Sequence, residues 1–317
     1  MAENGAAPAA SPAVSPAVSI VIPHYNQPDG LALGLASLAA QISKRSIEVL
    51  VVDNGSQQLP DAVCARFPFV RLMREPSRGP GPARSTGARA ARAPVIAFLD
   101  ADCTADPDWV ARLLDRFAAD PSVDILGGAV RIAFADPTQP TAIEGFEEVF
   151  AYRQQLFIER DGYCATCNMA VRAQVFAEVG PFGGLDIAED LDWGQRATAL
   201  GKQIVYAREM RIATPARASF AEVRRKLDRQ VGHDYVRART RKFGRLRWAL
   251  KTVAMPLSPL AEIRRIASAE RLRGLPVKAG TFVVLVRTRL WRARRMAELL
   301  AGRDPTALSA GWRRTTA

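Results

Sequence analysis

Two aspartates, two positions apart, follow a run of apolar residues. Asp100 and Asp102 come directly after PVIAFL, with Ala101 between them. Ligands of open α/β sheets bind outside the carboxyl ends of the strands, so these carboxylates are expected on the ligand side. Oxygen ligands at this spacing suit a hard divalent ion such as Mg²⁺ or Mn²⁺, which could neutralise a diphosphate. Asp-x-Asp is also common in solvated turns. The interpretation as a metal site therefore depends on the position of the two aspartates directly after the apolar run.

A second group of carboxylates, Glu189, Asp190 and Asp192, begins a predicted helix over 190–200. Acidic side chains are favoured at helix N-termini by the helix dipole and by capping, so a structural role is an open alternative. One carboxylate that holds a metal diphosphate and another that takes a proton are the minimum for transferring a group from a nucleotide to a hydroxyl. The sequence supplies both.

Polar residues also follow the first two apolar runs of the chain. The segments are Pro23-His24-Tyr25-Asn26 and Asp53-Asn54-Gly55-Ser56. Both ends are expected on the ligand side of a sheet, although Asn-Gly and Asp-Asn are also ordinary turn formers.

The elements that would position these residues alternate between short β-branched runs and helical stretches. This alternation predicts a mostly parallel sheet flanked by helices. We expect strands at VSIVI, EVLVV, FVRLM, PVIAFL, ILGGAVRIAF, TCNMAV and KQIVYA, and helices near 31–42, 79–92 and 190–200. Runs that are apolar on both faces are typical of buried parallel strands.

The charge of the chain is divided unevenly along its 317 residues. Residues 1–207 hold 17 Lys/Arg against 24 Asp/Glu, a net charge of −7, whereas the remainder holds 27 against 8, a net charge of +19. A strongly basic tail suits an anionic partner, either phospholipid head groups or nucleic acid. Beyond Ala218 we expect arginine-rich helices broken near Pro256, Pro259 and Pro276.

A helix predicted over 282–300 gathers apolar residues on one side, while its arginines avoid that side. The apolar residues are Phe282, Val286, Leu290, Ala293, Ala297 and Leu300. This helix either lies in the interface between lipid and water or packs on the domain with a solvated basic face. No run approaches the ~20 apolar residues that a membrane span needs, and the first residues do not form a secretory signal.

Four cysteines are too few and too irregularly spaced for a secreted disulfide framework, so a reducing compartment is expected. Cys164 and Cys167 form one C-x-x-C pair. A structural zinc site would need further ligands, and the chain has only His24 and His233 to add.

Five ordered blocks together resemble the inverting GT-A-fold glycosyltransferases of family 2. They are VSIVIPHYNQ, VLVVDNGS, GPARSTGARAARAPVIAFLDADC, CNMAVRAQVFAEVGPF and AEDLDWGQRATALGKQIVYA, and they cover about Val18 to Ala207. The resemblance implies a GT-A fold, which is Rossmann-like, and a metal-dependent sugar transferase that uses a UDP- or GDP-sugar type of donor.

The resemblance also implies a role for each matching residue. Asp190 would be the catalytic base, and Asp102, with Asp100, would bind the metal. Acceptor-side candidates are Glu189, Asp192 and Trp193. The nucleotide sugar would be held by Pro23, Tyr25, Asp53, Asn54, Arg84, Asp100, Ala101 and Asp102.

Three departures from the family pattern bear on these roles. Thr214 stands where many relatives have a histidine, which puts a supporting metal or diphosphate contact in question. Pro181-Phe182-Gly183-Gly184 replaces a common Gly-Phe-Asp-Glu, so acceptor contacts can differ. Gln195-Arg196 is followed by ATAL and not by the Gln-x-x-Arg-Trp pattern of processive synthases, so transfer of a single sugar is expected.

We therefore predict a flexible leader over 1–17, a GT-A domain over 18–218 and a basic helical extension over 219–317. The function expected is transfer to a lipid-linked or cell-envelope glycan acceptor at the inner face of the cell membrane, against anionic lipid and without nucleic acid. The alternatives are a nucleic-acid- or membrane-binding protein with a nucleotide-sensing domain, and a family member without activity that is kept as a binding module.

Overall fold

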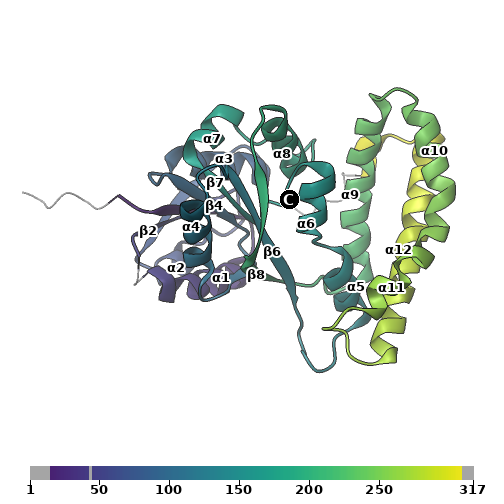
Figure 1. Ribbon diagram of the computed structural model, residues 1–317, viewed down its shortest axis with the longest axis horizontal. Helices are drawn as coiled ribbons and strands as arrows, with labels where there is room; N and C mark the ends of the chain where they lie inside the picture. Colours follow the sequence, from purple (N-terminus) through teal and green to yellow (C-terminus); the bar gives the residue numbers. More distant parts are fainter. Residues whose placement is uncertain (1–14, 43–44, 309–317) are drawn as a thin grey trace, which may run out of the picture.

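The computed structural model describes residues 15–42 and 45–308, and within them a mixed sheet with a helical part beside it (Figure 1). Residues 1–14 of the predicted leader lie outside the described residues. The sheet has eight strands in the order β3-β2-β1-β4-β7-β6-β8-β5. The predicted α/β class, with a mostly parallel sheet flanked by helices, is confirmed.

The first four strands are parallel. They are β1 (Val18–His24), β2 (Ile47–Asp53), β3 (Val70–Arg74) and β4 (Val95–Leu99), and α1 (Pro28–Ile42), α2 (Asp61–Cys64) and α3 (Pro80–Ala90) connect them. In the register of β1 and β2, His24 is paired with Asp53 at the carboxyl ends. The segments after β1, β2 and β4 therefore meet at one edge of the sheet.

The second half of the sheet contains the antiparallel pairs. Its strands are β5 (Thr104–Ala105), β6 (Ile125–Ala133), β7 (Asn168–Arg172) and β8 (Ile204–Pro215). β7 runs antiparallel to both β4 and β6, whereas β6 and β8 are parallel. The helices here are α4 (Trp109–Ala119), α5 (Ala142–Phe150), α6 (Gln154–Leu156), the π-helical turn η1 (Phe157–Asp161), α7 (Ala173–Val179) and α8 (Glu189–Ala199).

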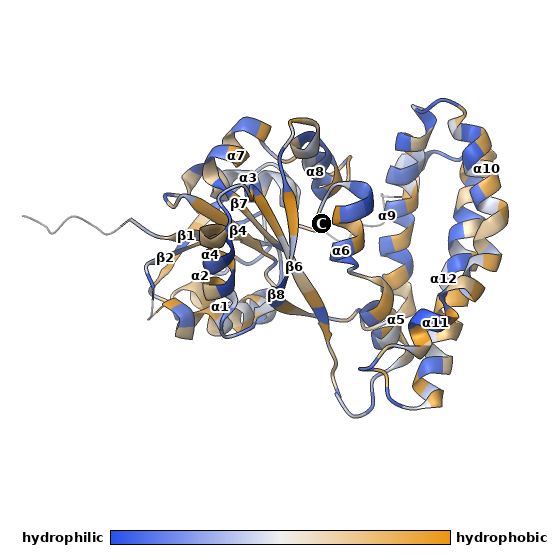
Figure 2. Ribbon diagram, in the orientation of Figure 1, coloured by the Kyte–Doolittle hydropathy of each residue, from blue (hydrophilic) through white to orange (hydrophobic). Residues whose placement is uncertain are grey.

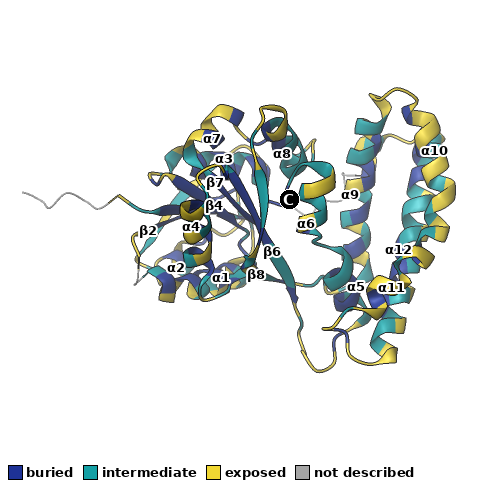
Figure 3. Ribbon diagram, viewed as in Figure 1, coloured by how far each residue is buried: buried dark blue, intermediate teal, exposed yellow. Residues whose placement is uncertain are grey.

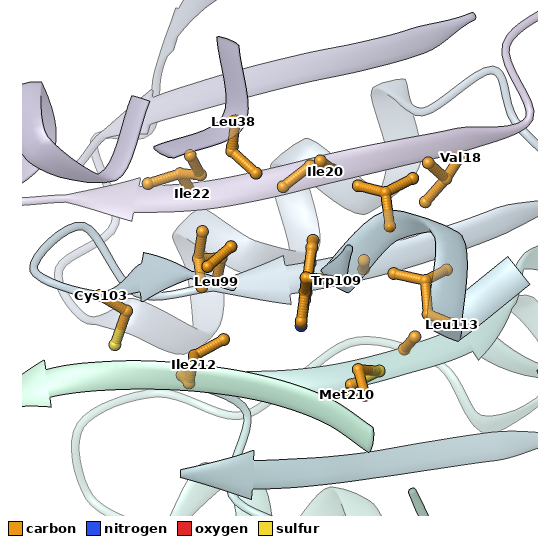
Figure 4. Packing of buried hydrophobic residues seen from close by; sticks show 14 of the residues in the cluster. Val18, Ile20, Ile22, Leu38, Leu99, Cys103, Trp109, Leu113, Met210 and Ile212 are labelled. Carbon is orange, nitrogen blue, oxygen red and sulfur yellow. The ribbon is translucent and has the colours of Figure 1, made fainter. Parts of the chain in front are cut away.

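The central strands are hydrophobic and buried (Figure 2, Figure 3). Each face of the sheet has its own core. Figure 4 shows one of them, in which side chains of β1, β4, β8, α1 and α4 surround Trp109. The other core includes Phe98, Phe176, Phe182 and Trp193, packed between the sheet and α3, α7 and α8. Burial on both faces explains the apolar runs of the strands.

The helical part begins after β8. It contains α9 (Phe220–Arg239), α10 (Gly244–Ala254), the 3₁₀ helix η2 (Met255–Glu262), α11 (Ile263–Ala267) and α12 (Leu275–Leu300). One of its cores joins α9, α11 and α12 to α5. A Cβ on Gly145 of α5 would come within 2.1 Å of Thr281 Oγ1 of α12, so glycine permits this close approach. The basic helices are thereby held against the sheet domain.

α12 is a packed helix, which confirms the packing expected in one of the two interpretations of its sequence. Its basic face is only partly solvated, since the Arg289, Arg292 and Arg295 side chains are 18%, 25% and 14% exposed. The side that it buries, however, differs from the predicted apolar side: its buried residues are Thr281, Val284, Leu285, Thr288, Met296 and Leu299. Leu290, on the predicted side, is exposed. The helical wheel failed because threonines and one methionine contribute to the buried side. Pro276 stands in the first turn of α12, where proline is tolerated, and does not break the helix.

No helix within the described ranges is both long and apolar enough to span a bilayer. Cys64, Cys103, Cys164 and Cys167 are free and buried. Cys164 and Cys167 belong to the two different cores of the sheet, so the C-x-x-C motif is part of the packing.

Candidate active site

The loop after β4 carries the first acidic pair. Asp100, Ala101 and Asp102 follow Leu99 and come close to the start of α1. A Cβ on Gly30 would lie 3.1 Å from the Asp102 Cα, so the glycine lets the helix pack directly against this loop. The backbone that presents both carboxylates is therefore supported by a helix.

Arg84 of α3 connects the two acidic groups. Its Nη2 donates to Asp100 Oδ1 at 2.6 Å, and its Nη1 donates to Glu189 Oε1 at 3.1 Å. The Arg84 side chain is 4% exposed, so its guanidinium is shielded from water, whereas the Asp100 and Glu189 side chains are 33% and 20% exposed. Charge-assisted hydrogen bonds of this kind are stronger than neutral ones and hold the two carboxylates in a defined orientation. The structure thus brings the loop after β4 and the start of α8 together.

Asp190 lies beside Glu189 in the first turn of α8. One of its carboxylate oxygens accepts a hydrogen bond of 2.8 Å from the Leu191 backbone N–H. Burial, and then the charge of Glu189, raise the pKa of Asp190 to about 6. A carboxyl group with a pKa near the working pH is suited to accept a proton from a hydroxyl.

Asp102 has a similarly perturbed carboxyl group. Burial, and then the charge of Asp100, raise the pKa of Asp102 to about 6. Its only close side-chain partner within the described residues is the weak thiol donor of Cys103, at 3.7 Å. A desolvated carboxylate with no strong donor is suited to bind a cation.

No set of three or more His, Cys, Asp or Glu side chains arranged as metal ligands occurs within residues 15–42 and 45–308. Asp102 and the oxygen of Asp100 that Arg84 does not bind would by themselves be only part of a coordination sphere. The chemistry of these ligands fits Mg²⁺ or Mn²⁺, which usually keep several ligands from water or phosphate.

The ends of β1 and β2 form the next part of the site. His24 Nδ1 lies 2.9 Å from Asp53 Oδ1, and both side chains are buried. The Ser56 hydroxyl donates to the same aspartate. Burial alone would raise the pKa of Asp53, but the hydrogen bonds from Ser56 and His24 outweigh it and lower the pKa. Asp53 is thus an ionised residue that orders the loop after β2.

Asn54 connects that loop to the approach of α3. Its Nδ2 donates to the Glu75 and Ser77 carbonyl oxygens, and its Oδ1 accepts from the Gly79 N–H at 2.6 Å. With all its hydrogen-bonding groups engaged, Asn54 holds the strand-end loops in place.

Pro23 and Tyr25 lie at the end of β1, both half-buried. The Tyr25 hydroxyl is buried and has no hydrogen-bond partner among the described residues. An unpaired buried hydroxyl is costly unless a ligand satisfies it. Among the nucleotide-side residues predicted from the sequence, Tyr25 therefore offers a free polar group.

Two of the predicted acceptor-side residues lie elsewhere. Trp193 is 1% exposed, donates its indole N–H to the Gly180 carbonyl oxygen and stacks on Phe176. Asp192 pairs with Arg196 one turn along the surface of α8. Trp193 belongs to the core beneath α8, and Asp192 is engaged by Arg196, so neither side chain is free to contact an acceptor. Glu189 is the acceptor-side candidate that remains beside Asp190.

Thr214, in the position where relatives have a histidine, is buried near the end of β8. Its hydroxyl hydrogen-bonds the Cys103 thiol, whose sulfur lies 3.7 Å from Asp102 Oδ1. Arg217, three residues later, donates its backbone N–H and its guanidinium to the buried Glu147 of α5. The charge of Arg217 acts on Asp102 and lowers its pKa slightly.

α9 contributes further cations that the sequence analysis did not single out. Lys226 lies with Nζ 5.0 Å from the centre of the Tyr152 ring, and burial, followed by the charge of Arg217, lowers the pKa of Lys226 to about 8. The charge of Arg229, one turn later, acts to lower the pKa of Asp190. The i, i+3 spacing of Lys226 and Arg229 was the one available signal, but it is lost among the many arginines of the tail.

A family model described as glycosyl transferase family 2 matches residues 19–180. The chain is 31% identical over 215 residues to glycosyltransferase AglE of Haloferax volcanii, across 66% of this chain and 69% of that protein. It is 29% identical over 197 residues to the pre-mycofactocin glycosyltransferase of Mycobacterium tuberculosis, of which the match spans 40%.

Two solved structures share the fold. The mannosyltransferase PcManGT of Pyrobaculum calidifontis, in complex with GDP-Man and Mn²⁺, gives a TM-score of 0.60 at 16% identity, over 92% of this chain and 88% of that one. Residues 1–349 of TarS from S. aureus give a TM-score of 0.50 at 16% identity, over 94% and 91% of the two chains. At these identities the likeness concerns the fold.

Proposed function

This chain belongs to glycosyltransferase family 2 and has the GT-A fold, and we propose that it is a metal-dependent, inverting, non-processive enzyme that transfers a sugar to a hydroxyl group. The observation that carries the proposal is the Arg84 bridge. It connects the loop of Asp100 and Asp102 to the start of α8 at Asp190. Inversion requires a base and a leaving group at opposite sides of one carbon, and this arrangement supplies candidates for both.

Asp190 is the proposed base. It takes the proton of the acceptor hydroxyl while that oxygen attacks the anomeric carbon from the face opposite the nucleotide. The raised pKa of Asp190 supports this role, because the carboxylate has to hold the proton as the new bond forms. Glu189, fixed by Arg84, keeps the first turn of α8 oriented.

Asp102, assisted by Asp100, is the proposed site for Mg²⁺ or Mn²⁺. When bound, the ion would supply Lewis-acid stabilisation of the charge that grows on the departing diphosphate. Asp102 contributes a desolvated carboxylate, and Arg84 keeps Asp100 in position. The PcManGT complex contains Mn²⁺ together with a nucleotide sugar, which supports the same assignment for this fold.

Arg217 is proposed to supply the contact that a histidine at position 214 would make in relatives. Its guanidinium is held by Glu147, and its charge reaches Asp102. Lys226 adds a second cation on the same side. Positive charge at this place favours the diphosphate of a donor.

A nucleotide diphosphate sugar, of the UDP or GDP type, is the proposed donor. The nucleotide side would be lined by Pro23, Tyr25, Asp53 and Asn54. The Tyr25 hydroxyl, which has no partner among the described residues, would hydrogen-bond the nucleotide. The GDP-Man in the PcManGT complex supports this class of donor. The proposed acceptor is a lipid-linked or cell-envelope glycan at the inner face of the cell membrane, and the basic tail and the free, buried cysteines support that location.

The test is a screen of UDP- and GDP-sugars for thermal stabilisation in the presence and absence of Mn²⁺, followed by turnover of each stabilising donor. We expect one donor class to raise the Tm only with the metal. Asp102→Ala should abolish that metal-dependent rise, whereas Asp190→Ala should keep it and lose turnover. NMR of the product should show the anomeric configuration inverted.

The same experiment separates the alternatives. A retained configuration would overturn the role of Asp190. Binding of a donor without turnover, by a folded protein given a range of lipid-linked and glycan acceptors, would favour the non-catalytic binding module. Full activity in the presence of EDTA would exclude the metal role of Asp102.

A further inference from the structure

A row of large apolar side chains is exposed along α10, η2 and α11. We call it the outer stripe, and it consists of Phe243, Leu246, Leu250, Val253, Leu257, Leu260 and Ile263. The exposed fraction of these residues runs from 48% at Ile263 to 77% at Val253. Figure 2 and Figure 3 show hydrophobic and exposed residues along α10, which lies on the side of the helical part turned away from the sheet.

The spacing of the outer stripe is regular. Its members recur every three or four residues from Phe243 to Ile263, which places them along one side of consecutive helical turns. The same segment also has an inward side: Trp248 packs in a core with Tyr235, and Ile266 packs in the core shared with α5. The segment is therefore apolar on two sides, and its own fold needs only one of them. Contiguous exposed apolar surface of this kind marks an interaction site.

Positive charge surrounds the outer stripe. Residues 239–265 contain eight Lys/Arg and a single acidic residue, Glu262. Glu262 pairs with Arg265. Within the described part of the chain, the seven others are exposed and have no carboxylate partner: Arg239, Arg241, Lys242, Arg245, Arg247, Lys251 and Arg264. This charge is thus available to an external anionic partner.

We propose that the outer stripe is a docking surface for an anionic phospholipid membrane, with α10 lying in the interface between lipid and water. Transfer of leucine, valine and phenylalanine side chains from water to the boundary between head groups and acyl chains is favourable in free energy. The flanking Lys/Arg attract the anionic head groups. This proposal rests on the membrane location given under Proposed function, but it assigns the contact to α10, η2 and α11 and not to α12.

Charge and shape favour a membrane over the two other occupants. A second copy of this chain would bring two strongly basic surfaces face to face, which repel each other. Nucleic acid would use the cations, but it offers no apolar surface for Leu250, Val253 and Leu257, and stacking on bases requires a platform of aromatic residues. Phe243 is the only aromatic member of the stripe.

The test is co-sedimentation of the whole chain with two kinds of vesicle, across a salt series and without nucleotide sugar. One kind is phosphatidylcholine alone, and the other contains about one anionic phosphatidylglycerol in three lipids. We expect binding to the anionic vesicles only, weakening as salt rises. Leu246→Ser, Leu250→Ser and Leu257→Ser together should weaken binding about tenfold or more, because burial of three leucines is lost. Arg245→Gln, Arg247→Gln and Lys251→Gln together should remove most of the salt dependence.

Matched controls come from the sheet domain. Leu33 and Leu200 are as exposed as the stripe leucines, so Leu33→Ser with Leu200→Ser should leave vesicle binding unchanged. Arg66→Gln with Arg208→Gln is the corresponding charge control, since both side chains are exposed. Circular dichroism checks that every variant is folded. Asp190→Asn should bind vesicles like the unmodified chain, which keeps this test separate from the catalytic proposal.

Three outcomes would overturn the docking surface. One is unchanged vesicle binding by the triple leucine variant. Another is a dimer in analytical ultracentrifugation without lipid that the same variant dissociates, which would assign the stripe to a second copy. The third is sedimentation with duplex DNA but not with anionic vesicles, which would assign the cations to nucleic acid.

Discussion

Arg84 and Glu189 are joined by a hydrogen bond of 3.1 Å although 105 residues separate them in the sequence. The same guanidinium also holds Asp100, so one buried side chain sets the distance between the loop after β4 and the start of α8. A rigid arginine fork that contacts two carboxylates at once is well suited to this task. The relative position of the proposed metal and base residues therefore depends on α3, an element that carries no reacting group itself.

Asp190→Asn is predicted to lower kcat by about 10²–10⁴-fold, the usual contribution of a positioned general base. The amide cannot take the hydroxyl proton, but it keeps the shape of the carboxyl group. The KM for the donor should change by less than about threefold. Steady-state kinetics measure both values, and Asp192→Asn on the exposed side of α8 serves as the matched control. Similar losses in the two variants would contradict the assignment.

Activity is predicted to fall as the pH drops through about 6, because Asp190 has to be ionised to act as a base. The charge of Arg84 lowers the pKa of Asp190, so Arg84→Gln should move the acid limb of the pH profile to higher pH. Arg84→Lys keeps the positive charge and should move it less. The profile of kcat against pH measures these shifts. An acid limb that stays in place in Arg84→Gln would show that the two groups do not interact.

Asp190→Asn is also predicted to stabilise the fold at neutral pH. The pKa of Asp190 rises from an ordinary 3.8 to about 6 on folding, so burial penalises its ionised form. That penalty is absent below about pH 4, where the group is protonated in both states, and it is complete above about pH 6. Removing it should add about 1–3 kcal/mol to the free energy of unfolding, a rise in Tm of about 2–6 °C.

Thermal unfolding at pH 7.5 and pH 4 measures this gain, which should be complete at the first value and reduced to a small remainder at the second. A destabilised Asp190→Asn protein at pH 7.5 would mean that the carboxylate makes stronger contacts in the folded chain than those described. A buried carboxylate that is suited to take a proton would thus lower the stability of the fold, a trade-off between activity and stability.

The sheet was predictable from the sequence because its strands are apolar on both faces. The runs at VSIVI and PVIAFL needed no tertiary information to be identified, and the carboxylates after β4 fell on the expected edge. α12 was harder. Its buried side includes Thr281 and Thr288, which a wheel based on hydropathy assigns to solvent.

The candidate site was predictable only where a local pattern existed. Asp102 and Asp190 stand in motifs, but no pattern in the sequence indicates that Arg84 joins their loops or that the charge of Arg217 acts on Asp102. Glu147, which holds Arg217, lies 70 residues away on α5. Contacts of this kind depend on how separate elements pack, which periodicity does not contain.

Arg217→Met is predicted to raise the KM for the donor about tenfold with a smaller change in kcat, because a cation near Asp102 is lost while the base at Asp190 is unaffected. Thr214→His should not restore the loss. Thr214 is buried against Cys103, so an imidazole there has no room to reach the diphosphate and should instead destabilise the fold. Arg208→Met, on the exposed surface of β8, is the control. An unchanged KM in Arg217→Met would contradict the role of Arg217. Recovery of donor binding in the Arg217→Met, Thr214→His double variant would show that an imidazole at position 214 can reach the donor after all.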